Sequence, residues 1–133
     1  MIIGDSKVDW KKFDAVLFDL DGVITATASV HAASWKKMFD EFLAAHAEQT
    51  GGEFVEFDIE GDYKPYVDGR PRYDGVATFL KSRQIDLPRG DPSDDPDQET
   101  VCGLGNRKNA LIQEVLATDG VEVYEGSVKL VFW

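Results

Sequence analysis

The chain has 133 residues, of which 43% are hydrophobic and 29% are charged, and its net charge at pH 7 is −11. This composition predicts one globular domain or slightly more. It argues against a nucleic-acid partner and against a membrane-surface partner, because both need clustered Lys and Arg. The single cysteine, Cys102, excludes a disulfide within the chain. Because no disulfide can form, we expect a cytoplasmic protein. No signal peptide or membrane span is predicted.

A short apolar run follows a mixed lead-in of residues 1–12. From Phe13 to Phe18 the sequence is almost continuously apolar, which predicts a strand buried on both faces. The run leads directly into Asp19 and Asp21. Open α/β folds bind ligands beyond the carboxyl ends of their strands, so these two acids are candidates for a ligand site.

The rest of the chain is predicted to be mostly helical. Apolar residues recur at helical spacing over residues 28–49, and a pair of glycines ends this helix. A second helix is predicted over residues 75–85, with Asp74 as its N-cap. Residues 86–100 are rich in Pro and Asp and predict a surface loop. A third helix is predicted over residues 107–119.

Two carboxylates separated by one residue suit phosphoryl chemistry. An aspartate can act as a nucleophile by forming an acyl-phosphate, which is the role we expect for Asp19. Asp21 would then be the general acid and base. Mg²⁺ would screen carboxylate from phosphate, and it takes oxygen ligands. Gly22 permits a close approach of the backbone, and Thr25 offers a hydroxyl or backbone donor to a substrate.

Two alternative interpretations of this stretch require no catalysis. The first is a strand that simply ends in an acidic turn. The second is an EF-hand loop, which also places acids at alternate positions but needs a Glu at its twelfth position. In DLDGVITATASV that position is Val30, so the calcium loop is disfavoured.

Five segments resemble one family, in the order in which that family has them. FDLDGVIT resembles the first motif of the haloacid dehalogenase (HAD) superfamily of phosphatases and phosphomutases. HAASW, VDGRPRYDGVATFL, GNRKNALIQEVL and VYEG resemble successive parts of its β-phosphoglucomutase-like branch. They match the start of the first cap helix, the specificity loop, a Lys-bearing cap helix and the return to the core. The resemblance extends from Phe13 to Gly126.

The resemblance implies an α/β fold with two parts. One is an HAD-like (Rossmannoid) core, of which only the first strand is present, and the other is a mostly helical cap domain. Residues 1–26 would form the first core strand and the catalytic loop, and residues 27–122 would form the cap. Residues 123–133 would return to the core, where the chain looks truncated.

The resemblance also implies roles for individual residues. Asp19 would be the nucleophile and Asp21 the general acid and base. Both would hold Mg²⁺, Asp21 through its main-chain carbonyl. His31 would tie closure of the cap to the position of Asp21. Arg72 would bind the phosphate that is not transferred, and Lys108 would reach the substrate phosphate or sugar.

Each of the cap residues has a structural alternative. His31 could be a satisfied histidine at a helix terminus. Arg70 and Arg72 could belong to a solvated loop, and either could be the arginine that matches the family. Lys108 could be an ordinary surface lysine near a helix start.

The implied activity is the conversion of β-glucose 1-phosphate to glucose 6-phosphate through an aspartyl-phosphate, with a small-molecule sugar phosphate as the partner. The alternatives are a phosphatase acting on a small phosphate ester and a non-enzymatic, cap-like binding module. The later motifs of the family would follow Gly126, where only SVKLVFW remains. We therefore expect little or no activity from this chain alone, and self-association through its exposed core strand.

Overall fold

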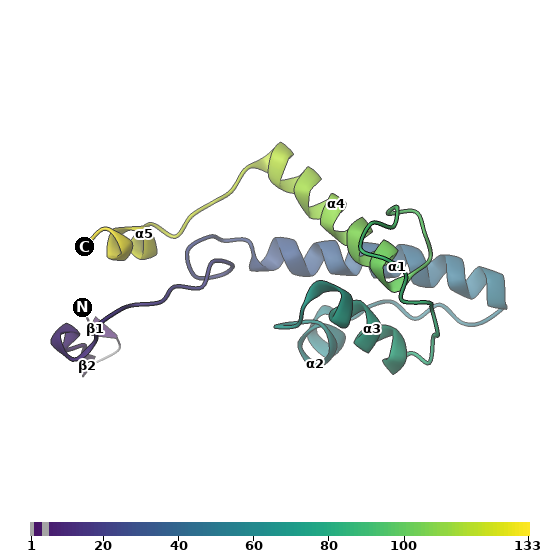
Figure 1. Ribbon diagram of the computed structural model, residues 1–133, viewed down its shortest axis with the longest axis horizontal. Coiled ribbons are helices and arrows are strands. Elements are labelled where there is room, and N and C mark those ends of the chain that lie inside the picture. Colours follow the sequence, from purple (N-terminus) through teal and green to yellow (C-terminus); the bar gives the residue numbers. More distant parts are fainter. Residues whose placement is uncertain (1, 4–5) are drawn as a thin grey trace.

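A helical bundle makes up the larger part of the protein. The computed structural model describes residues 2–3 and 6–133 (Figure 1). A 23-residue helix, α1 (Ala28–Thr50), runs through the bundle, and α4 (Val101–Asp119) packs along it. The bundle is completed by the π-helical turn η2 (Ile59–Tyr63) and by the helices α2 (Lys64–Tyr66) and α3 (Arg72–Ser82).

Both ends of the chain leave the bundle on the same side (Figure 1). The N-terminal segment contains a two-stranded antiparallel sheet and a 3-10 turn, and the C-terminal segment contains one short helix. These elements are β1 (Ile2–Ile3), β2 (Ser6–Lys7), η1 (Trp10–Lys12) and α5 (Glu125–Val131). Among the described residues, no helix is both long enough and apolar enough to cross a membrane.

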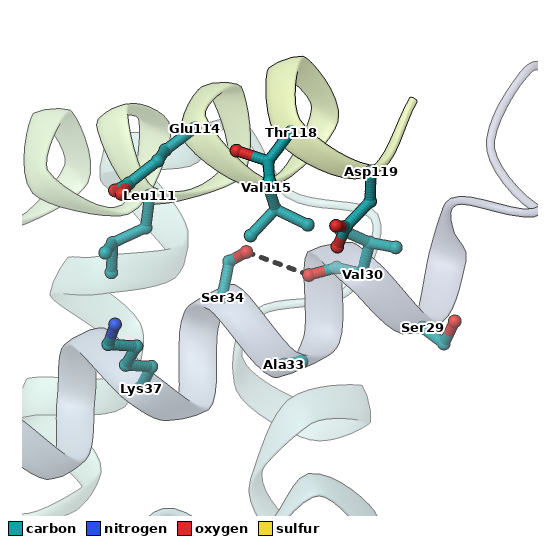
Figure 2. A pocket seen from close by; sticks show the side chains of 10 residues that line it. All are labelled: Ser29, Val30, Ala33, Ser34, Lys37, Leu111, Glu114, Val115, Thr118 and Asp119. Carbon is teal, nitrogen blue, oxygen red and sulfur yellow. Dashed lines mark hydrogen bonds between the residues drawn. The ribbon is translucent and has the colours of Figure 1, made fainter. Parts of the chain in front are cut away.

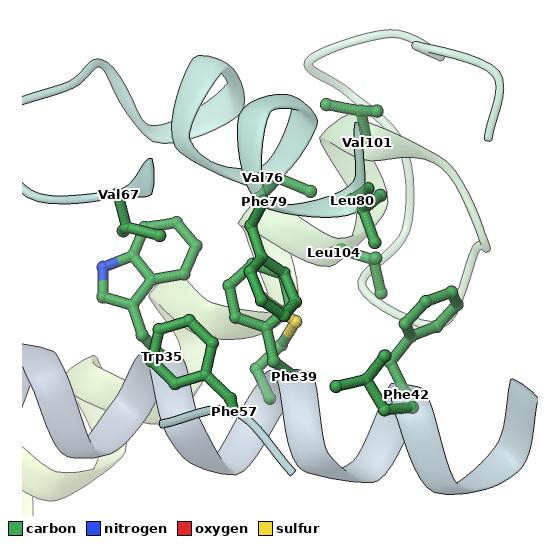
Figure 3. Close-up of a cluster of buried hydrophobic side chains, with 12 residues drawn as sticks. Trp35, Phe39, Phe42, Phe57, Val67, Val76, Phe79, Leu80, Val101 and Leu104 are labelled. Carbon is green, nitrogen blue, oxygen red and sulfur yellow. The ribbon is translucent and has the colours of Figure 1, made fainter. Parts of the chain in front are cut away.

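The core of the bundle is an aromatic cluster centred on Phe39 of α1 (Figure 3). The ring centroid of Phe39 lies 4.2 Å from that of Phe79 in α3 and 5.1 Å from that of Phe57. These three side chains are completely buried. Burial of aromatic rings is a large source of stability, so this cluster holds α3 and the segment after α1 against α1.

The bounds of the first helix confirm the prediction made from its apolar spacing. The predicted range was 28–49, and α1 ends one residue later at Thr50. Gly51 follows with φ of 71°, the left-handed conformation that glycine adopts without strain at a helix end. The predicted loop over 86–100 is also confirmed, since those residues form no regular helix or strand.

The other two helices begin earlier than predicted. The N-cap position of α3 is Pro71 rather than Asp74, because the fixed φ of proline suits a helix start. Asp74 lies in the first turn instead, where its negative charge faces the helix N-terminus favourably. The third helix begins at Val101 because the hydroxyl of Thr100 accepts a hydrogen bond from the Gly103 amide at 2.9 Å.

The prediction of a buried strand over Phe13–Phe18 is wrong for this structure. These residues form no ladder, and the Leu17 side chain is 95% exposed. A strand buried on both faces needs hydrogen-bonded neighbours and covering layers. Among the described residues no strand pairs with this segment. The HAD-like core strand of the sequence prediction is therefore absent here, whereas the mostly helical region agrees with the predicted cap.

The two segments that connect the bundle to the chain ends pair with each other. The Ala26 amide donates to the Glu122 carbonyl at 2.8 Å, and the Tyr124 amide donates to the Ile24 carbonyl at 2.9 Å. These antiparallel contacts hold the start of α1 close to the segment that follows α4. The domain boundaries predicted after residues 26 and 122 lie in these two paired segments, and they stay predictions.

Candidate functional site

One pocket contains all but one of the site residues predicted from the sequence. It has a volume of about 370 Å³ and lies where the loop before α1 meets α1, α4 and the turn between α2 and α3. Predicted residues that line it are Asp19, Asp21, His31, Arg72 and Lys108. The lining is completed by Ala28, Trp35, Tyr63, Val67, Asp68, Gly69 and Arg70. Segments far apart in sequence thus converge on one cavity.

A tight turn presents the two acids to this pocket. The amides of Val23, Ile24 and Thr25 all donate to the carbonyl of Leu20, at 3.2, 2.9 and 3.0 Å. Gly22 makes the turn possible, because its φ of 78° is one that residues with a side chain rarely adopt.

Two threonines stabilise the acidic turn through hydrogen bonds. The Thr27 hydroxyl donates a hydrogen bond to Oδ1 of Asp21. The hydroxyls of Thr25 and Thr27 lie 2.8 Å apart, and that of Thr25 also reaches the Leu20 carbonyl at 3.2 Å. Both threonines are buried. Thr25, predicted as a substrate donor, is therefore outside the pocket lining, whereas Thr27 was missed although a threonine before a helix is a recognisable signal.

A chain of polar contacts crosses the pocket from α4 to the acidic turn. Nε2 of His31 lies 3.2 Å from Oδ1 of Asp21, and Nδ1 of His31 lies 2.8 Å from Nζ of Lys108. Since an ammonium only donates, Nδ1 accepts and the Nε2 proton faces Asp21. Burial and the nearby Lys108 charge lower the pKa of His31, and the Asp21 carboxylate opposes this shift.

Lys108 is a buried cation at this site, not a surface lysine. Its residue exposure is 6%, and Nζ lies 5.1 Å from the centre of the Trp35 ring. Burial lowers the pKa of Lys108 to about 8, the Arg72 charge adds to the effect, and Asp21 opposes it. The aromatic face partly compensates the buried ammonium.

Arg72 is positioned by the contact between α3 and α4. Its guanidinium lies 5.1 Å from the centre of the Tyr73 ring, and Nη2 lies 3.4 Å from the Tyr73 hydroxyl. That hydroxyl donates to Oδ1 of Asn106 in α4 at 2.8 Å. Gly105 lets the helices approach, since a Cβ there would lie 2.7 Å from Cδ1 of Tyr73. The half-buried Arg72 is thus held by packing.

The segment between α1 and α3 supplies residues that sequence reasoning missed. Tyr63 and Asp68 line the pocket and were not predicted as site residues. Arg70 lines it too, and the sequence offered it only as an alternative to Arg72. Burial raises the pKa of Tyr63, and the Asp68 and Asp21 carboxylates add to this effect. No periodic pattern identified this segment, because it forms a π-helical turn and a very short helix.

The donor set of the pocket includes oxygen ligands that suit Mg²⁺. Asp19 and Asp21 line the same cavity, where Asp19 offers its carboxylate and Asp21 its main-chain carbonyl, and hard cations of this kind take oxygen ligands. Within the described ranges, no group of three or more His, Cys, Asp or Glu residues gathers as a metal cluster. These two acids would be part of a Mg²⁺ site rather than a complete ligand set.

A larger cavity, of about 520 Å³, lies between α1 and the C-terminal half of α4 (Figure 2). It contains none of the predicted site residues. Its lining combines aliphatic side chains with polar and charged ones, and Lys37 is the single cation among the residues that line it. The chemistry predicted from the sequence therefore lies in the smaller pocket.

Comparisons with known proteins agree with the resemblance seen in the sequence. A family model described as haloacid dehalogenase-like hydrolase matches residues 13–133. A β-phosphoglucomutase of Mycobacterium bovis is 55% identical over 117 residues, which is 88% of this chain and 45% of that protein. A β-phosphoglucomutase of Mycobacterium tuberculosis gives the same values.

A more distant relative is an uncharacterised glycosyl hydrolase of Mycobacterium tuberculosis. It is 38% identical over 111 residues, which cover 84% of this chain and 8% of that protein. The chain therefore spans less than half the length of these relatives.

Proposed function

The chain belongs to the haloacid dehalogenase-like hydrolase family, and on this premise we propose that its pocket takes part in phosphoryl transfer on a sugar phosphate, as in a β-phosphoglucomutase. The observation that carries the proposal is the convergence of Asp19, Asp21, Arg72 and Lys108 on one cavity. Such a reaction needs acids for the chemistry and cations that bind phosphate, and the pocket contains both.

Asp19 and Asp21 have different roles in the proposed reaction. An oxygen of Asp19 bonds to phosphorus as the bond from phosphorus to the sugar oxygen breaks, and Asp21 donates a proton to the departing oxygen. In the second half, Asp21 takes the proton of the attacking hydroxyl as the phosphoryl group leaves Asp19. Mg²⁺ held by these two residues would reduce the repulsion between carboxylate and phosphate.

The remaining residues bind and orient. Arg72 and Lys108 attract the phosphate of the substrate. His31 keeps Asp21 in place through its Nε2 proton, supported by the 3.2 Å separation from Oδ1. Nζ of Lys108 lies 2.8 Å from Nδ1 of His31, on the other side of the ring. A displacement of Lys108 by a ligand is therefore passed through His31 to Asp21. Thr25 supports the turn that carries both acids.

A phosphatase is the second candidate. The Asp21 side chain is 45% exposed, so water can reach the group that would activate it. In that case the phosphoryl group would pass from Asp19 to water rather than to a sugar hydroxyl. The reaction products separate the two functions: glucose 6-phosphate indicates transfer, and free phosphate indicates hydrolysis.

The test is to trap the phosphoryl group on the nucleophile. The full chain is incubated with acetyl phosphate and Mg²⁺, and its peptides are analysed by mass spectrometry. We expect a phosphoryl adduct on Asp19 that is lost in Asp19→Asn. Trapping reports on the nucleophile directly, because it needs no turnover.

Asp14→Asn is the matched control, because Asp14 is a nearby exposed acid outside the pocket lining. It should leave the adduct unchanged. An adduct that persists in Asp19→Asn would contradict the assigned nucleophile. A wild-type chain that forms no adduct would favour the non-enzymatic binding module.

A further inference from the structure

Two arginines, not one, face the pocket from the turn between α2 and α3. We propose that Arg70 is a second anion-binding residue, which contacts the same substrate phosphate as Arg72. The inference rests on the proposed function, since it extends the phosphate site that this function requires. It would make the pocket selective for a dianionic group over a singly charged or neutral one.

The backbone of the turn directs both arginines to one side. Gly69 reverses the chain with φ of 71°, and the Arg70 amide donates to the Val67 carbonyl at 3.2 Å. Pro71 between the arginines has φ of −52° and ψ of 144°, which is an extended conformation. In extended backbone, residues i and i+2 project to the same side. Arg70 and Arg72 accordingly both line the cavity.

Both guanidinium groups keep hydrogen-bond donors for a ligand. Within the described part of the chain, neither arginine has an ion pair with a carboxylate. Nη2 of Arg70 lies 3.4 Å from the Pro65 carbonyl, and Nη2 of Arg72 lies 3.4 Å from the Tyr73 hydroxyl, which are long hydrogen bonds. A guanidinium has five N–H donors, so most remain available for two-pronged contact with phosphate.

The surroundings of the two arginines give them complementary roles. Arg72 is half-buried and packed over Tyr73, so it is a fixed contact with little freedom to lose on binding. Arg70 is exposed, and among the described residues its side chain is restrained by a hydrogen bond to the Pro65 carbonyl alone. Arg70 can therefore close over an anion already held by Arg72, and it adds the second positive charge at the pocket entrance.

Binding of inorganic phosphate to the full chain tests the proposal, because this probe has a single anionic group. Titration calorimetry compares the wild type with Arg70→Ala, Arg72→Ala and Arg70→Lys. We expect Arg70→Ala to weaken phosphate binding about tenfold, the effect of losing one charge-assisted contact. Arg70→Lys keeps the positive charge but loses the two-pronged geometry of the guanidinium, so its phosphate affinity should lie between those of the wild type and Arg70→Ala. Glucose 6-phosphate should give the same order.

Arg89→Ala is the matched control. Arg89 is exposed, lies outside the pocket and pairs with Asp74 at 3.4 Å, and its loss changes the net charge equally. Its phosphate affinity should stay within about twofold of wild type. Equal, small effects of Arg70→Ala and Arg89→Ala would overturn the proposal, and so would a wild-type chain that binds no phosphate. Asp19→Asn should still bind phosphate, so failure of the nucleophile assignment is separable from failure of the Arg70 assignment.

Discussion

At the residue scale, Lys108 links the sequence pattern to the chemistry of the pocket. A lysine near a helix start is usually on the surface, yet this one is 6% exposed and contacts both His31 and the Trp35 ring. Burying an ammonium costs free energy, which its lowered pKa records. A position that carries such a cost is a candidate for function rather than for folding.

The titration of Lys108 predicts a pH dependence of anion binding. Because the pKa of Lys108 is lowered to about 8, its charge is present below that pH and is lost above it. Affinity for sulfate, whose own charge does not change in this range, should fall as the pH rises from 7 to about 9. Titration calorimetry at several pH values measures this directly.

The lowered pKa of Lys108 also makes the free energy of unfolding depend on pH. Between about pH 8 and the ordinary lysine value of 10.5, the unfolded chain binds the proton that the folded chain has released. The contribution of Lys108 to the free energy of unfolding therefore rises with pH across this window. Lys108→Met is the control for both effects. A sulfate affinity that falls equally steeply in this variant would assign the dependence to another group.

At the scale of elements, the contact between α3 and α4 determines where the cations of the site lie. Arg72 begins α3 and Lys108 lies in α4, so the pocket exists only while these helices pack closely. Gly105 and Tyr73 form that contact, because the absent side chain leaves room for the ring. A glycine within a helix lowers helix propensity, but here it permits the close approach.

Gly105→Ala tests this packing. Helix propensity alone would make the variant more stable by about 1 kcal/mol. The new Cβ would lie 2.7 Å from Cδ1 of Tyr73 and 3.2 Å from Cγ of Arg72, and overpacking of this kind costs about 1–3 kcal/mol. We expect a net loss of unfolding free energy in chemical denaturation, together with weaker phosphate binding.

Gly126→Ala is the matched substitution, since nothing lies within 4 Å of a Cβ added at that helical glycine. It should leave phosphate binding unchanged and not destabilise the chain. A Gly105→Ala variant as stable as wild type would show that Tyr73 shifts without cost.

At the scale of the whole molecule, apolar surface is concentrated outside the bundle. Exposed large apolar side chains gather in the two end segments, with Leu17 at 95% and both Phe132 and Trp133 at 85% exposure. Exposed apolar patches of this kind favour association between protein molecules. Trp10 and Trp133 lie with their ring centroids 6.2 Å apart, which joins the two segments.

Leu17→Glu is predicted to reduce self-association. The substitution places a charge within the exposed apolar segment and removes no buried contact, because Leu17 is 95% exposed. Sedimentation at increasing protein concentration should show a shift toward smaller species than in wild type. Val55→Glu adds the same charge at a half-exposed site in the bundle and should have no such effect. Identical sedimentation of wild type and Leu17→Glu would contradict the prediction.

The sequence alone determined much of the local structure and of the chemistry. The spacing of Trp35, Met38 and Phe39 determined α1, because helical periodicity is a local property. The family was recognisable from FDLDGVIT, since that short segment contains both acids. Five of the six predicted site residues line one pocket in the structure.

Only the tertiary structure decided how these residues meet. Residues 13–18 have the composition of a buried strand, but burial depends on neighbours, and no described strand pairs with them. Thr25 lies behind the acidic turn because long-range pairing near Val123 fixes the turn. The buried position of Lys108 depends on contacts from α1, and Arg70 joins Arg72 because Gly69 and an extended proline turn the backbone. Such contacts join residues distant in sequence, so local patterns do not encode them.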